Sequence, residues 1–316
     1  MTKKNSTDRK DIFTNITDTI VAAIEAGASK YEMPWNKQGA DSMLPVNAVT
    51  RKPYRGANVL MLWATAEEKG YPTHVWATYK QWEQLGAQVR KGEKSSLIIF
   101  WKFRLQQQEA ADAPTEEATV KGRVIPMARA YCVFNAAQVD GWKGGEVAAP
   151  TKTEAQRMTE AENFFRKTGA RIHEGGNRAC YNPLTDEIRM PKFEQFKAGE
   201  LFYSTLAHEI VHWTGGRSER SPRDLNKRFG SEGYAMEELV AELGSAFLSA
   251  ELGLQLDARK DHAPYVQNWL TVLKNDKRAI FTAATKAQNA VDYLLKLTGW
   301  AGEEEPDGEE GVPIAA

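Results

Sequence analysis

The stretch TLAHEIVHWTGG, residues 205–216, contains the side chains of this sequence that are best suited to hold a metal ion. His208 and His212 stand four positions apart, and residues with that spacing project from the same face of an α-helix. Two imidazoles placed in this way can bind one zinc ion, and Glu209 beside them can act as a general base. The alternative is a helix with two ordinary surface histidines. The metal site is favoured, because the motif lies in a strongly helical segment that ends at a pair of glycines.

A catalytic zinc site needs a third protein ligand, and the stretch MEELVAEL, residues 236–243, offers candidates. Glu238 and Glu242 are again four positions apart, on one helical face. We expect Glu238 to bind the ion and Glu242 to accept the N–H of a ligating histidine, which would fix the tautomer of that ring. Glu237 projects about a third of a turn away and is the poorer choice. The expected ion is divalent, with zinc as the first choice and manganese as the alternative.

These residue types favour hydrolytic chemistry. A divalent ion lowers the pKa of water and polarises a carbonyl, and a nearby carboxylate can take up the proton that is released. We therefore predict peptide-bond hydrolysis, with Glu209 as the catalytic base. The sequence does not identify a protein substrate.

The rest of the chain mixes patterns that are typical of helices and of strands. Helical spacing predicts helices over 8–27, 57–69, 78–85, 153–168, 199–213, 233–253, 262–275 and 279–298. Strand-forming residues predict strands over 96–104, 124–134, 170–176 and 178–191, the last being a hairpin. The Gly- and Pro-containing stretch 140–153 separates two halves. We predict an α+β fold with domains over 1–145 and 146–300 and an acidic disordered tail over 301–316.

The first third of the chain is basic and rich in aromatic residues. Residues 1–105 contain 16 Lys and Arg against 10 Asp and Glu, a net charge of about +6. Aromatic rings stack on unpaired bases and cations pair with phosphates, so such a surface suits single-stranded DNA better than a duplex. The alternative is that most of these rings pack in the core. The candidate DNA contacts are Trp35, Lys37, Arg51, Lys52, Tyr54, Arg55, Arg90, Lys91 and Lys94.

The composition is that of a globular protein, with 42% hydrophobic and 26% charged residues. No apolar run approaches the roughly 20 residues that cross a bilayer, and the polar N-terminus MTKKNSTDRKD is unlike a secretory signal. Cys132 and Cys180 are far apart, which argues against a disulfide framework or a cysteine zinc site. We expect a cytoplasmic protein without a membrane partner.

Several longer stretches match one known family in order. They are MPWNK (33–37), PVNAVTRKPYRGANVLML (45–62), TYKQWEQLGAQVRKGEKSSLIIFWK (78–102), YCVFNAAQVDG (131–141), YSTLAHEIVHWTG (203–215) and GYAMEELVAELGSAFL (233–248). Together they resemble plasmid antirestriction proteins of the ArdC family, whose N-terminal domain also begins certain conjugative plasmid primases. The resemblance covers nearly the whole chain apart from the termini and residues 105–122.

The resemblance implies an N-terminal domain that binds single-stranded DNA non-specifically and a zincin-like, SprT-like C-terminal domain. His208, His212 and a downstream glutamate would be the metal ligands, and the choice between Glu238 and Glu242 stays open. The implied role is to protect incoming plasmid DNA from host restriction during conjugation, with host restriction-modification proteins as possible targets. Two alternatives remain: a DNA-coating module whose metal is structural or catalytically silent, and a general metallopeptidase that binds no nucleic acid.

Overall fold

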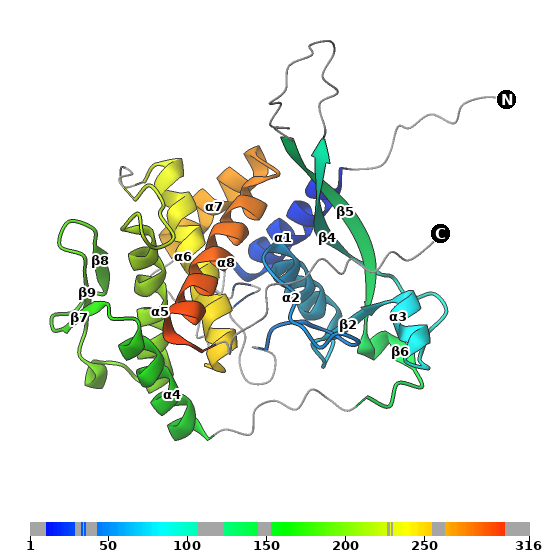
Figure 1. Cartoon of the computed structure of the whole chain (residues 1–316), viewed down its shortest axis with the longest axis horizontal. Coiled ribbons are helices and arrows are strands. Elements are labelled where there is room, and N and C mark those ends of the chain that lie inside the picture. Colours follow the sequence, from blue (N-terminus) through cyan, green and yellow to red (C-terminus); the bar gives the residue numbers. More distant parts are fainter. Residues whose placement is uncertain are drawn as a thin grey trace, which may run out of the picture.

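A computed structural model of the chain describes residues 11–28, 33, 35, 43–106, 123–144, 153–225, 228, 230–254 and 263–300. Helices and strands mix in both halves of the chain, so the predicted α+β class is confirmed (Figure 1). The acidic tail 301–316 and most of the stretch 105–122 lie outside the described residues.

The N-terminal half combines three helices with two small sheets. The helices are α1 (Ile12–Ala28), α2 (Ala57–Lys69) and α3 (Tyr79–Gln84). The strands are β1 (Val46–Asn47), β2 (Val75–Thr78), β3 (Gln88–Val89), β4 (Ser96–Gln106), β5 (Arg123–Asn135) and β6 (Val139–Asp140), with a 3-10 turn, η2 (Ala136–Gln138). One sheet has the order β1-β2-β5-β4, and β3 pairs with β6. Strands β4 and β5 form a long antiparallel ribbon that projects from the molecule (Figure 1).

The C-terminal half is mainly helical and carries one three-stranded sheet. Its helices are α4 (Glu154–Lys167), α5 (Gly199–Gly215), α6 (Glu232–Leu252), α7 (Ala263–Asn275) and α8 (Ala279–Thr298). Its strands are β7 (Arg171–Glu174), β8 (Cys180–Asn182) and β9 (Glu187–Met190), followed by a 3-10 turn, η3 (Phe193–Gln195). The sheet order is β7-β9-β8, which leaves β8 at an edge. Strand β8 packs beside α5, the helix that carries His208, Glu209 and His212.

The predicted elements are present, and the strands that the sequence missed are short. β1, β2, β3 and β6 each span two to four residues. So few residues show no periodicity, and these strands are fixed by pairing with distant partners, as β2 is with β5. β7 pairs in parallel with β9, which the spacing of the segments did not indicate.

One hydrophobic cluster joins the two halves. It contains Ile20 from α1, Trp63 from α2, Phe247 from α6 and Ile280 from α8, all of them buried. Figure 1 shows the helices α5–α8 between the small sheet β7–β9 and the helices α1 and α2. The N-terminal half thus packs directly on the helices that carry the candidate site. No helix among the residues described here has the length and apolarity needed to span a membrane.

Helices α5 and α6 pack closely where Gly244 meets Val211. A methyl group added at Gly244 would lie 2.8 Å from Val211 Cγ2, closer than side chains approach in practice. The small residue therefore allows the two helices to come together, which brings the carboxylates of α6 within reach of the histidines of α5. Ser231 begins α6 by accepting the backbone N–H of Tyr234, and Gly253, with φ of 67°, ends it.

Candidate metal centre

Helix α5 presents the two histidines of the motif to the same point. His208 Nε2 and His212 Nε2 lie 3.2 Å apart, one turn from each other along the helix. The helix is buried on almost every face, and His208 is only 4% exposed. Two ring nitrogens this close are stable when a proton or a cation lies between their lone pairs. The sequence prediction that both rings face one site agrees with this geometry.

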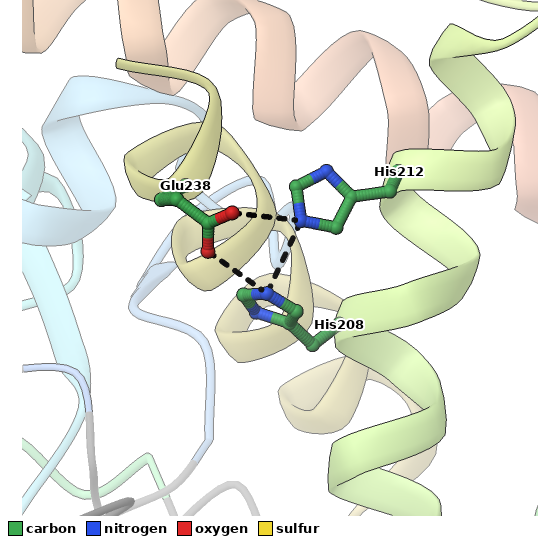
Figure 2. A group of neighbouring side chains, drawn as sticks. All are labelled: His208, His212 and Glu238. Carbon is green, nitrogen blue, oxygen red and sulfur yellow. Dashed lines mark hydrogen bonds and ion pairs between the residues drawn. The ribbon is translucent and has the colours of Figure 1, made fainter. Parts of the chain in front are cut away.

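Helix α6 adds Glu238 as a third group (Figure 2). Its Oε2 lies 3.5 Å from His208 Nε2 and its Oε1 lies 3.7 Å from His212 Nε2. Burial raises the pKa of Glu238, but the hydrogen bond with His208 and the charges of both histidines outweigh burial and lower that pKa to about 2. Glu238 is therefore an anion that points at both ring nitrogens.

The three donor atoms fit a metal ion. Around a tetrahedral ion with bonds of about 2.0–2.2 Å, neighbouring ligand atoms are separated by about 3.3–3.6 Å. The two ring nitrogens, 3.2 Å apart, match this separation, and each of them has one oxygen of the Glu238 carboxylate at 3.5 or 3.7 Å. Among the described residues, His208, His212 and Glu238 form the one group of three such side chains that converge closely enough to hold an ion.

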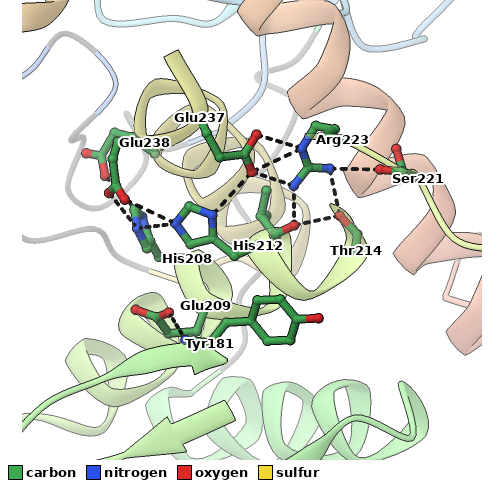
Figure 3. Close-up of polar contacts among 11 residues, drawn as sticks. Tyr181, His208, Glu209, His212, Thr214, Ser221, Arg223, Glu237 and Glu238 are labelled. Carbon is green, nitrogen blue, oxygen red and sulfur yellow. Dashed lines mark hydrogen bonds and ion pairs between the residues drawn. The ribbon is translucent and has the colours of Figure 1, made fainter. Parts of the chain in front are cut away.

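One oxygen of Glu209 reaches the edge of the small sheet. Its Oε2 accepts the backbone N–H of Tyr181 on β8 at 2.8 Å, and its side chain is 6% exposed (Figure 3). The Tyr181 hydroxyl in turn donates to Asp186, which Arg220 binds through two hydrogen bonds of 2.8 and 2.6 Å. The edge strand therefore fixes one oxygen of Glu209 and defines the direction of the carboxylate.

Glu237, the poorer ligand candidate in the sequence, contacts His212 on the side away from the donor atoms. Its Oε1 lies 3.2 Å from His212 Nδ1, and Arg223 Nε approaches its two oxygens at 3.1 and 3.0 Å (Figure 3). Burial alone would raise the pKa of Glu237. The hydrogen bond with His212 and the charge of Arg223 outweigh burial, so the pKa lies below its ordinary value. The ionised carboxylate can accept a hydrogen bond from the N–H at Nδ1 and leave Nε2 of His212 available to an ion.

Arg223 holds Glu237 from a segment without regular structure. Its side chain is 3% exposed and also donates to Thr214 Oγ1 at 3.0 Å and to the carbonyl of Ser221 at 3.1 Å. No pattern in the sequence indicates a site role for Arg223, because the segment 216–225 lacks periodicity and its arginines resemble surface residues. The four-residue spacing of Glu238 and Glu242 can be recognised in the sequence, whereas the pairing of Arg223 with Glu237 cannot.

Glu242 lies on the opposite side of His208 from the donor atoms. Its Oε2 is 3.8 Å from His208 Nδ1, and its Oε1 accepts the indole N–H of Trp35 at 3.1 Å. Each histidine therefore faces the site with Nε2 and a buried glutamate with Nδ1. This placement favours Glu238 over Glu242 as the third ligand, which remains a prediction.

Two of the expected DNA contacts are corrected by the structure. Trp35 is 1% exposed and Tyr54 is 5% exposed, so neither ring is available for stacking on a base. Their loops read as polar in the sequence, but Trp35 reaches the helices of the C-terminal half, and the Tyr54 hydroxyl accepts a bond from Asn47 at 3.1 Å. Loop position alone was the wrong criterion, since a large aromatic side chain can be buried wherever it stands in the sequence.

The predicted basic contacts are exposed where they are described. Arg51 and Lys52 lie on the turn after β1, and Lys91 and Lys94 lie between β3 and β4. Arg90 already pairs with Glu93 at 2.9 Å, and Arg55 pairs with Asp292 of α8. Lys37 lies outside the described residues.

Other aromatic rings of the N-terminal half do reach the surface. Phe100 on β4 is 49% exposed and Tyr79 at the start of α3 is 46% exposed. Phe100 contacts Tyr131 edge-to-face, with centroids 5.4 Å apart, and stands opposite Arg129 in the β4–β5 register. Because Phe100 follows two buried isoleucines within an apolar run on β4, its outward direction could not be inferred from that run.

Two protein families match separate parts of the chain. Residues 10–134 match the N-terminal domain of the anti-restriction factor ArdC, and residues 159–286 match a zincin-like metallopeptidase domain. The first region includes all the predicted DNA contacts, and the second includes His208, Glu209, His212 and Glu238.

Relatives of known sequence or structure cover nearly the whole chain. An uncharacterized protein, y4eC, of Sinorhizobium fredii is 47% identical over 90% of this chain and 91% of its own length. A DNA primase TraC from Escherichia coli is 36% identical over 92% of this chain, which spans 20% of that primase.

Crystal structures of the antirestriction protein ArdC from plasmid R388 are similar at 40% identity. The metal-free structure has a TM-score of 0.73 and covers 92% of this chain and 98% of its own. The Mn(II)-bound structure has a TM-score of 0.71 and covers 93% of this chain and all of its own. A divalent metal in this fold is therefore supported by a solved relative as well as by the donor geometry.

Proposed function

Because this chain belongs to the ArdC family of antirestriction proteins, we propose that it protects incoming plasmid DNA by binding single strands and by a metal-dependent peptidase site. The observation that carries the peptidase part is the convergence of His208, His212 and Glu238, with Glu209 on the adjoining helical position. The ion that we propose is zinc, since two imidazoles and one carboxylate are a common catalytic zinc set, with manganese as the alternative.

The protein groups around the ion have distinct roles in this proposal. A bound divalent ion would supply Lewis-acid chemistry, lowering the pKa of water and polarising a carbonyl. Glu209 would take the proton of the attacking water and return it to the departing amine. The Tyr181 N–H holds one of its oxygens and leaves the other for this transfer. Proteins bound to DNA, including host restriction subunits, are the substrates that we propose.

Cleavage of fluorescently labelled casein by the zinc-loaded protein tests the peptidase part, with and without a single-stranded oligonucleotide. Glu209→Gln should lower the cleavage rate by about 10²-fold or more while it retains the metal, because it removes the base and spares the ligands. Glu219→Gln, an exposed change beyond the end of α5, is the matched control. Equal cleavage by wild type and Glu209→Gln would contradict the assignment.

A second measurement distinguishes the peptidase proposal from the alternative in which DNA coating alone gives protection. Transfer of unmodified plasmid into a restricting host is scored with wild type or Glu209→Gln supplied by the donor. If the variant protects as well as wild type, DNA coating is sufficient and the hydrolytic site is dispensable for antirestriction. If protection is lost, the peptidase site is part of the function.

The proposed DNA surface is the exposed face around Phe100, Tyr131 and Arg129. Stacking of a base on an aromatic ring is worth about 1–3 kcal/mol, so Phe100→Ala should weaken binding of a single-stranded oligonucleotide roughly tenfold or more. Phe193→Ala removes a ring of similar exposure, 39%, from the C-terminal half and is the control. Mobility shifts across a salt series measure both, and equal affinities would exclude this face.

A further inference from the structure

Trp35 connects the N-terminal half of the chain to the metal centre. It is 207 positions away from Glu242 in sequence and belongs to the region that matches the N-terminal ArdC domain. Its ring is 1% exposed and lies 6.4 Å from the ring of Trp269 on α7. Its indole N–H donates to Glu242 Oε1 at 3.1 Å, in a buried setting.

In this hydrogen bond Trp35 can only donate, and Glu242 needs a donor because it is buried. Glu242 is 5% exposed, and a buried carboxylate is stable only when donors satisfy its oxygens. The indole group donates and cannot accept, so Trp35 fixes which oxygen of Glu242 faces it and thereby the orientation of the carboxylate. With Oε1 held by Trp35, Oε2 is turned toward His208 Nδ1, at 3.8 Å.

The arrangement around His212 provides a comparison within the same molecule. His212 Nδ1 faces Glu237, and Glu237 is held by Arg223, so all three residues belong to the zincin-like region. His208 Nδ1 faces Glu242, and Glu242 is held by a residue of the other domain. Each histidine thus has a buried carboxylate behind it and a nitrogen donor behind the carboxylate.

We propose that Trp35 is a positioning residue of the metal centre and that the N-terminal domain thereby completes the site. By holding Glu242, Trp35 keeps a carboxylate oxygen 3.8 Å behind Nδ1 of His208, and closure of that gap to a hydrogen bond when an ion binds would direct Nε2 of the ring toward the ion. This inference rests on the proposed metal site. It predicts that affinity for the metal depends on a side chain that touches neither the ion nor its ligands.

The test compares two buried tryptophans that each lose one N–H. Trp35→Phe keeps a ring in place and removes the donor to Glu242. Trp63→Phe is the control, because its N–H donates to the Met43 carbonyl at 3.0 Å and its ring packs on Phe247, nine positions after Glu238 on α6. Zinc affinity is measured on the full-length proteins by competition with a chromogenic chelator, after circular dichroism shows that each variant is folded.

The expected result is a loss of zinc affinity of about tenfold or more for Trp35→Phe and a change within about twofold for Trp63→Phe. The visible absorption bands of the Co²⁺-loaded protein should shift in Trp35→Phe and not in Trp63→Phe, since a merely structural loss would leave the ligand field unchanged. In a Glu242→Gln background, Trp35→Phe should add little further loss, because an amide has one acceptor oxygen and cannot face both Trp35 and His208 with an acceptor, so the link is already broken.

The outcomes separate this inference from the function on which it rests. If wild type binds no zinc, Mn²⁺ or Co²⁺, the proposed metal site fails. If wild type binds zinc and Trp35→Phe binds it as tightly as Trp63→Phe, the role of Trp35 is overturned and the metal site stands. Should Trp35→Phe not fold, Glu242→Gln interrupts the contact from the other end, and wild-type zinc affinity in that variant would overturn the proposal.

Discussion

Replacement of Glu237 by Gln gives the most direct test of how the site is built. The change keeps the shape of the side chain and removes its charge. Glu237 is 12% exposed and Arg223 is 3% exposed, so the pair is shielded from solvent. Arg223 would retain one amide oxygen as an acceptor and would lose the anion that compensates its own buried charge.

The expected magnitude follows from these contacts. Breaking a buried ion pair by removing one partner costs about 3–5 kcal/mol of unfolding free energy, and the remaining amide oxygen places the expectation near 3 kcal/mol. The same change removes the acceptor of the His212 Nδ1 proton. Loss of such a partner weakens metal binding about 10–100-fold, which is about 1.4–2.7 kcal/mol. Glu237→Gln should therefore lower both stability and zinc affinity.

Two measurements on each protein check this prediction. Urea denaturation at neutral pH gives the unfolding free energy of the metal-free protein, and chelator competition gives the zinc affinity of the folded protein. Glu232→Gln, an exposed change in the first turn of the same helix, is the control. If Glu237→Gln lost no more stability than Glu232→Gln and bound zinc equally well, the relay from Arg223 through Glu237 to His212 would be wrong.

Three further predictions concern packing, pH and metal. Gly244→Ala should destabilise the protein by about 1–3 kcal/mol in urea denaturation, because its methyl group overlaps Val211, and Val211→Ala in the same chain should recover part of that loss. Hydrogen bonds from Arg220 lower the pKa of Asp186, so the folded state binds its proton less readily than the unfolded state. The contribution of Asp186 to stability is present above about pH 4 and is lost as pH falls through the folded pKa. When the urea midpoint of unfolding is plotted against pH, Asp186→Asn should reduce the fall of the midpoint at acid pH. The control Asp140→Asn changes an exposed carboxylate and should leave that fall unchanged. Zinc at a hundred times its dissociation constant should stabilise the wild type by about 2.7 kcal/mol in thermal melts, and EDTA or His212→Ala should abolish that gain.

The elements that could be predicted from the sequence are those with a regular spacing of apolar residues. The helix over 57–69 and the helix that carries His208 and His212 follow from apolar spacing and from terminal glycines. The pairing of those histidines with an acid on a later helix follows from the same periodicity. Short strands such as β3 have no comparable pattern, because their positions depend on partners far away in sequence.

Residues that support the site from irregular segments could not be predicted. Arg223 and Trp35 each bind a buried glutamate from segments without periodicity, and their types suggest a surface cation and a DNA contact. Only the folded chain shows that α6 carries three carboxylates toward α5 and that each needs a donor. The aromatic residues of the N-terminal half were misjudged for a related reason, since exposure depends on which segments cross the core.

The buried charges give an independent reason to expect a cation at this site. Glu209 on α5 and the neighbouring Glu237 and Glu238 on α6 are all largely shielded from solvent. Of the lysines and arginines that the structure describes, Arg223 is the one within ion-pair distance of these three carboxylates. A buried anion without a counter-charge costs several kcal/mol, and neutral donors such as the Tyr181 N–H offset only part of that cost. Glu242, also buried, adds a fourth carboxylate beside His208, and a divalent cation at the ring nitrogens would offset two of these charges, so the arrangement of the acids favours metal binding even before any catalytic role is considered.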